Sequence, residues 1–129
     1  MDLRPLFTAR FTRAWRLLLA LLMGVVAWFA FMPGSPFGGF SNFDKLQHVL
    51  AFLTLSAVAS LAWAPRAWHE ARVALGLLLY AVLIELVQTQ LPTRTASAAD
   101  VVADAAGIAL GLLLARQMLR WAGNPQRPT

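Results

Sequence analysis

The stretch Trp15–Met32, WRLLLALLMGVVAWFAFM, decides the fold class of this chain. Its 18 residues contain a single charge, Arg16. A helix of about 20 apolar residues crosses the ~30 Å hydrocarbon core of a bilayer. Three further stretches of similar length and composition follow, at Leu46–Ala64, Val73–Leu91 and Val101–Trp121. The chain is therefore predicted to be an all-α membrane protein with four transmembrane helices.

The composition supports this assignment. Of the 129 residues, 59% are hydrophobic and 13% are charged, whereas a soluble domain carries about 25% charged residues. We predict a basic lead-in at residues 1–14, a membrane domain at 15–121 and a tail at 122–129. Short loops make consecutive spans antiparallel neighbours, which predicts a four-helix bundle with no separate soluble catalytic domain.

The distribution of basic residues predicts the orientation of the bundle. The chain has 11 Lys and Arg residues and a net charge of +5. All but Lys45 and Arg94 lie before or at the start of span 1, between spans 2 and 3, or at or after the end of span 4. By the positive-inside rule both termini are predicted to be cytoplasmic. The excess of basic residues is thus explained by membrane topology and by contact with membrane lipids. We predict no nucleic-acid binding.

A competing interpretation makes residues 1–32 a cleaved signal peptide. The segment has a basic start, an apolar stretch and then Pro33 and Gly34. Its apolar part is longer than the usual signal core, and no small-x-small cleavage motif follows it. We therefore favour a retained first span.

Polar residues within and beside the spans form the second main feature. If the spans alternate in direction, these residues all fall near one face, the outer one in the predicted orientation. Charge inside a bilayer costs several kcal/mol or more, so it persists where it is paired, hydrated or functional. A polar site near the outer face is therefore predicted. Its embedded members are His48, Glu85, Gln88 and Asp104, with Asp44, Lys45, Arg94 and Asp100 just above them.

Two of the acidic residues also have a structural explanation. Asp44 and Asp100 each lie three residues after a serine and just before an apolar stretch, a pattern typical of a helix start. His48 and Asp104 lie one turn deeper, where no capping role reaches them, and Glu85 is expected at a similar depth. These three residues are the stronger candidates for a functional site.

Several chemistries remain open for such a site. Lys45, Arg94 and the starts of spans 2 and 4 could hold an anionic headgroup. One histidine with carboxylates could hold a divalent metal, but no His-rich or Glu-x-x-His spacing is present, so we predict no metal and no cofactor. The absence of cysteine excludes disulfides and iron–sulfur ligation. Acid–base hydrolysis by His48 and Glu85 is a further alternative.

Span 4 carries small residues four apart. They are Ala99, Ala103, Gly107, Gly111 and Ala115. Such a stripe lets another backbone approach closely. We expect it to pack against a helix of the same bundle, with a homo-oligomer face as the alternative.

The spacing of the polar residues resembles that of the VanZ-like family of small bacterial membrane proteins. The matching motifs are Lys45-x-x-His48-x-x-x-Phe52, then Glu85-x-x-Gln88-x-x-x-Pro92-x-Arg94, then Asp100-x-x-x-Asp104-x-x-Gly107. The three motifs occur in the same order as in the family, and together they extend over about half of the chain. This chain departs from the family pattern at Asp104, where an asparagine is expected.

The resemblance implies a multi-pass protein of the plasma (inner) membrane, and hence of the cell envelope, in a family named after a protein associated with resistance to the antibiotic teicoplanin. It locates a site without naming a reaction. We predict a pocket that binds an anionic envelope lipid or a lipid-linked cell-wall precursor. The alternatives are an enzyme acting on a lipid headgroup through His48 and Glu85, and a structural or assembly factor. The predicted ligand-binding residues are Lys45, His48, Glu85, Gln88, Arg94, Asp100 and Asp104.

Overall fold

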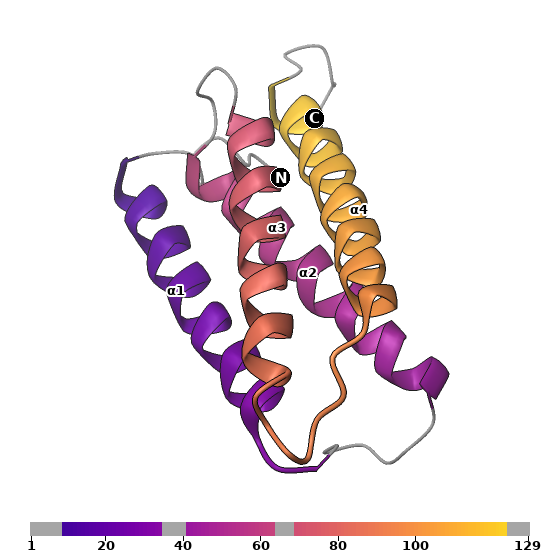
Figure 1. Cartoon of the computed structure of the whole chain (residues 1–129). Helices are drawn as coiled ribbons and strands as arrows, with labels where there is room; N and C mark the ends of the chain where they lie inside the picture. Colours follow the sequence, from indigo (N-terminus) through magenta and orange to yellow (C-terminus); the bar gives the residue numbers. More distant parts are fainter. Residues whose placement is uncertain (1–8, 35–40, 64–68, 124–129) are drawn as a thin grey trace.

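The computed structural model describes residues 9–34, 41–63 and 69–123, which form four helices and no strand. The helices are α1 (Ala9–Phe31), α2 (Ser41–Trp63), α3 (His69–Gln88) and α4 (Ala98–Gly123). They run alternately up and down (Figure 1). The end of α1, the start of α2, the end of α3 and the start of α4 therefore meet at one end of the bundle, called here the polar end. The predicted all-α bundle is confirmed.

Three of the four helices are long and apolar enough to cross a membrane. The qualifying segments are Phe11–Phe31, Phe43–Trp63 and Ala98–Trp121. The sequence analysis predicts a fourth span at Val73–Leu91, but α3 is not among the three; it is the shortest helix, with polar residues at both ends. The membrane placement of α3, like the cytoplasmic location of both termini, remains a prediction.

All four helices begin and end at residues other than the ends of the predicted spans, and two of these differences have a clear local cause. α1 begins at Ala9 rather than near Trp15, because the intervening residues include arginine and alanine, which are good helix formers. α3 ends at Gln88, three residues before the predicted end at Leu91. The amides of Gln90 and Leu91 close tight turns onto residues three earlier, at 3.0 Å each, and Pro92 then prevents the helix from continuing. Most of the predicted lead-in, the first loop and the tail lie outside the described residues.

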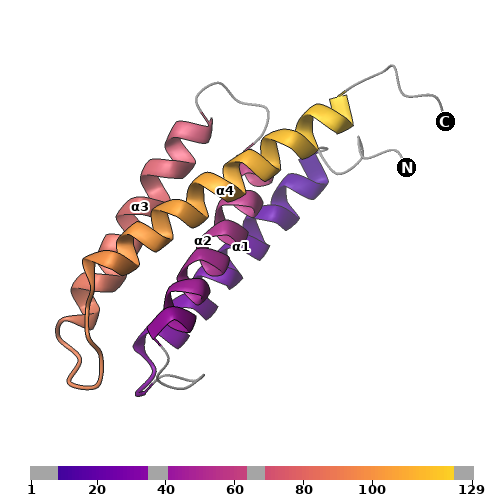
Figure 2. The same cartoon turned by 90° about the vertical axis from the view of Figure 1, so that its right-hand side faces the viewer.

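The centre of the bundle is the contact between α2 and α4, the most extensive pairing of helices (Figure 2). A Cβ on Gly107 would overlap the carbonyl oxygen of Val49 and lie 3.0 Å from the Leu53 nitrogen. A Cβ on Gly111 would overlap the Leu53 carbonyl and the Ser56 hydroxyl. The small-residue stripe of α4 therefore packs within the bundle, as expected, except at Ala99, which is exposed.

The apolar side chains divide between a core and an outer surface. The core includes Phe52 and Leu55 of α2, Leu77 and Ile84 of α3, and Ile108 of α4. Many large apolar side chains point outwards instead, on every helix: Leu17, Leu21, Leu50, Leu75, Leu79, Leu83, Leu110 and Leu113 are all exposed. A surface of this kind is suited to lipid rather than water.

The glycine contacts lead to a stability prediction. Gly111→Ala should lower the thermal midpoint in detergent, because the added methyl group must separate two backbones, and overpacking of this kind costs about 1–3 kcal/mol. Gly24→Ala is the matched control, since nothing lies within 4 Å of a Cβ there and alanine favours a helix. Equal midpoints for the two variants would contradict the packing described above.

A second prediction concerns the opposite end of the bundle, where Arg116 of α4 donates from both Nε and Nη2 to the carboxylate of Glu70 at the start of α3. The guanidinium holds the pKa of Glu70 below its ordinary value. A lowered carboxyl pKa adds stability above the ordinary value, and that stability is lost as the pH falls through the folded-state pKa. Glu70→Gln should therefore be slightly less stable than wild type at pH 7, and the difference should shrink as the pH falls through the folded-state pKa of Glu70. A difference in thermal midpoint that does not depend on pH would exclude this pair as the cause.

Candidate functional site

The polar end of the bundle brings together residues from three helices around His48. The imidazole Nδ1 lies 2.8 Å from Oδ1 of Asp104, so α2 and α4 are joined by a histidine–carboxylate pair. Asp104 is 1% exposed, and ligand atoms of His48, Glu85 and Asp104 lie within 4.8 Å of one another. The three residues that sequence analysis placed at one depth therefore converge.

The start of α4 is built by a cap in which Glu85 takes part. Ser97 precedes the helix, and its Oγ accepts from the Ala99 amide at 3.1 Å, which confirms the predicted helix start. In a capping box the acid three residues on would accept from the Ser97 amide. Here Oε2 of Glu85 accepts that amide instead, at 2.8 Å. Asp100, the acid three residues on, is thereby released from capping.

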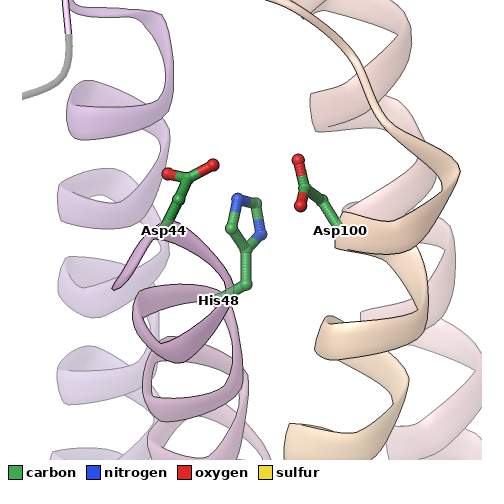
Figure 3. A group of neighbouring side chains, drawn as sticks. All are labelled: Asp44, His48 and Asp100. Carbon is green, nitrogen blue, oxygen red and sulfur yellow. The ribbon is translucent and has the colours of Figure 1, made fainter. Parts of the chain in front are cut away.

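Asp100 points towards His48. Figure 3 shows the imidazole between two carboxylates, Asp44 from the first turn of α2 and Asp100 from the first turn of α4. Ligand atoms of these three residues also lie within 4.8 Å of one another. Asp100 is 6% exposed and Asp44 is half-buried. His48 therefore belongs to two groups, an inner one with Glu85 and Asp104 and an outer one with Asp44 and Asp100.

Gln88 and Arg94 are directed to the end of α1. Gln88 Nε2 donates to the Ala30 carbonyl at 3.0 Å. Arg94 donates from Nη2 to the Phe29 carbonyl at 2.6 Å and from Nε to the Met32 carbonyl at 3.1 Å. The last carbonyls of a helix have no partner within the helix, and here they are satisfied by side chains from the end of α3 and the following loop. Sequence analysis did not predict this role.

A groove of about 300 Å³ lies between α1, α2 and the end of α3, and His48 lines it. Its other polar lining residues are Asp44, Gln47, Gln88 and Arg94, and the remainder of the lining is apolar. We call it the α1–α2 groove. Glu85, Asp100 and Asp104 do not line it, and Lys45 is exposed on α2 beside Asp44. The predicted site residues thus divide into those facing the groove, those buried beneath it and one exposed cation.

One of three comparisons with known proteins identifies a family for the chain. The family model of VanZ/LLP1 matches residues 7–120, which is most of the chain. The chain belongs to the VanZ/LLP1 family. The family resemblance drawn from the polar motifs is therefore confirmed, as is the assignment as a VanZ-like membrane protein. A search of the curated proteins and a search of the solved structures each found no match.

The position of Arg94 can be tested by hydrogen exchange. Arg94→Ala removes two charge-assisted donors from the α1 carbonyls, so the last turn of α1 should open more readily and its amides should exchange about tenfold faster. Lys45→Ala is the control, because Lys45 is exposed and should leave exchange in α1 unchanged. Unchanged exchange in Arg94→Ala would show that the arginine does not hold this helix end.

Proposed function

We propose that this VanZ-family protein binds an anionic envelope amphiphile, either a phospholipid or a lipid-linked cell-wall precursor, in the α1–α2 groove. The apolar chain of the ligand would lie along α1 and α2, and its headgroup would lie at the polar end. The observation that carries the proposal is the combination, in one groove, of a long apolar wall and a terminal set of polar side chains.

The apolar part of the groove is accessible from the side of the bundle. Val25 and Phe29 on α1 and Leu50 on α2 line it, and each is more than 40% exposed. In a bilayer this surface faces hydrocarbon, so an acyl or isoprenoid chain could enter laterally without crossing water. Phe52 forms the closed inner wall at 2% exposure. A lipid chain is thus the class of ligand that suits the lining.

The polar part of the groove supplies groups for a headgroup. Gln47 and His48 offer hydrogen bonds from α2, and Arg94 brings a positive charge to the wall even while two of its donors are used on α1. Lys45 is exposed nearby, and its long flexible side chain can reach a phosphate at the membrane surface. These cations support an anionic headgroup.

The enzyme alternative requires His48 and Glu85 to act together on a bound substrate. His48 lines the groove, but Glu85 is 7% exposed and does not. One of its oxygens accepts the Ser97 amide that starts α4. A general acid or base must come within hydrogen-bond distance of the substrate, and Glu85 is separated from the groove in this arrangement. We therefore favour binding over His48–Glu85 catalysis.

The test is to fill the groove. Ala51→Phe places a ring in the lining and should reduce the anionic phospholipid retained by the purified protein at least severalfold, measured by native mass spectrometry in detergent. Ala109→Phe, on the exposed face of α4, is the control and should retain lipid as wild type does. Titration with zwitterionic lipid tests the headgroup preference.

Three outcomes would contradict the proposal. Equal lipid retention in Ala51→Phe and Ala109→Phe, with both variants folded, would exclude the groove as the binding site. Equal binding of zwitterionic and anionic lipid would exclude recognition of an anionic headgroup. Turnover of a lipid by the wild-type protein, abolished in Glu85→Gln while binding survives, would favour the enzyme alternative.

A further inference from the structure

Four carboxyl groups lie around His48, and if ionised they would carry more negative charge than His48 alone can compensate. Glu85, Asp100 and Asp104 are each at most 7% exposed, and Asp44 is half-buried. A buried carboxylate is costly unless a cation or hydrogen-bond donors compensate it. His48 pairs with Asp104, and among the described residues no ion pair reaches Glu85, Asp44 or Asp100. A cation bound from outside the chain would provide the missing charge.

The hydrogen bonding of His48 indicates where such a cation would bind. If the imidazole is neutral, Nδ1–H donates to Asp104, and Nε2 is left with its lone pair. Histidine ligands in metal sites are commonly oriented in this way by a carboxylate on the other ring nitrogen. In Figure 3 a ring nitrogen faces the opening between Asp44 and Asp100. One imidazole nitrogen and two carboxylates thus face a common point.

Asp100 provides a second and independent observation. Asp100 is 6% exposed as a residue, and within the described part of the chain no hydrogen bond or ion pair engages its carboxylate. The usual use of an acid at this helix position, capping its own N-terminus, is taken over by Glu85. A buried carboxylate that is released from capping and directed at an imidazole lone pair is a typical metal ligand.

Although the residue spacing in the sequence predicts no metal site, we propose that Nε2 of His48 and the carboxylates of Asp44 and Asp100 bind one divalent first-row transition cation, of the Zn²⁺ or Mn²⁺ class. One imidazole with carboxylates suits these ions. One ring nitrogen of His48 and one oxygen of each of the two carboxylates lie within 4.8 Å of one another, and coordination would draw the ligand atoms to roughly 3.4 Å apart, as tetrahedral Zn²⁺ bond lengths of ~2.1 Å require. Small rotations of the Asp44 and Asp100 side chains can supply this change. Asp104 is the positioning residue.

The inner group of His48, Glu85 and Asp104 is the competing location. There the unpartnered atom is Oε1 of Glu85, which is buried without a hydrogen-bond partner. A cation bound in the inner group through Nδ1 would displace the proton shared with Asp104 and break the hydrogen bond that joins α2 to α4 at this level. The outer group keeps this contact and has Asp44 and His48 at the groove. The geometry therefore favours the outer group.

Three protein ligands leave a coordination position for water or for a phosphate oxygen. Binding of a phosphate oxygen by the cation rests on the proposed function. A cation at the wall of the α1–α2 groove would allow a site lined by carboxylates to accept an anionic headgroup. The cation site itself does not depend on lipid binding. A failure of metal binding would leave the result with Ala51→Phe unchanged, so the two proposals fail separately.

The experiment uses the full chain in detergent, freed of metal with a chelator and titrated with Mn²⁺ or Zn²⁺ alone. We expect one saturable site per chain, with affinity at least tenfold lower in Asp100→Asn and in Asp44→Asn. Echo-modulation spectra of bound Mn²⁺ should show one coordinated imidazole nitrogen, absent in His48→Ala. Asp104→Asn keeps an acceptor for Nδ1–H, so it should bind more weakly than wild type but retain the nitrogen signal.

The control is Glu70→Gln, which removes an acid at the opposite end of the bundle and should bind as wild type does. Thermal midpoints without metal establish that each variant is folded. Absence of saturable binding would overturn the proposal, as would equal affinity in wild type and both aspartate variants. Loss of binding in Glu85→Gln with binding retained in Asp44→Asn would also overturn it, by placing the cation in the inner group.

Discussion

The arrangement of the polar end depends on how closely α4 approaches α2. Gly107 and Gly111 present no Cβ towards α2, and a methyl group at either position would meet backbone atoms of Val49 or Leu53. His48 lies next to Val49, and Asp104 lies one turn before Gly107. The distance of 2.8 Å between their side chains is therefore set by the glycine contact rather than by the flexibility of either residue. Larger residues on α4 would separate the pair.

The remaining helices are attached through polar side chains that reach backbone groups. The hydroxyl of Tyr80 on α3 donates to the Met23 carbonyl of α1 at 2.6 Å. Gln88 and Arg94 hold the last turn of α1, and Glu85 holds the start of α4. In an apolar environment such bonds replace the water that would otherwise satisfy helix ends. The Glu-x-x-Gln-x-x-x-Pro-x-Arg motif thus joins three helices, which gives it a structural role in addition to any ligand contact.

Much of this could be predicted from the sequence because it depends on local pattern. Apolar length predicted the helices, Ser97 predicted the start of α4, and the alternating direction of the helices predicted that His48, Glu85 and Asp104 meet. The partners of Gln88 and Arg94 could not be predicted, because they are backbone carbonyls at the end of α1, 58 to 65 residues earlier, and a carbonyl has no sequence signature. The α1–α2 groove is likewise a product of helix packing. The sequence also does not show that Glu85, rather than Asp100, accepts the Ser97 amide at the start of α4, because this contact forms only in the folded bundle.

The central claim is that α2 and α4 meet through a hydrogen bond from His48 Nδ1 to Asp104, leaving the other ring nitrogen towards Asp44 and Asp100. The most direct measurement is the ¹⁵N spectrum of the His48 imidazole in lipid bilayers, assigned with a His69→Gln variant. The account predicts a protonated Nδ1 whose signal shifts in Asp104→Ala. A deprotonated Nδ1, or a spectrum that is identical in wild type and Asp104→Ala, would contradict it.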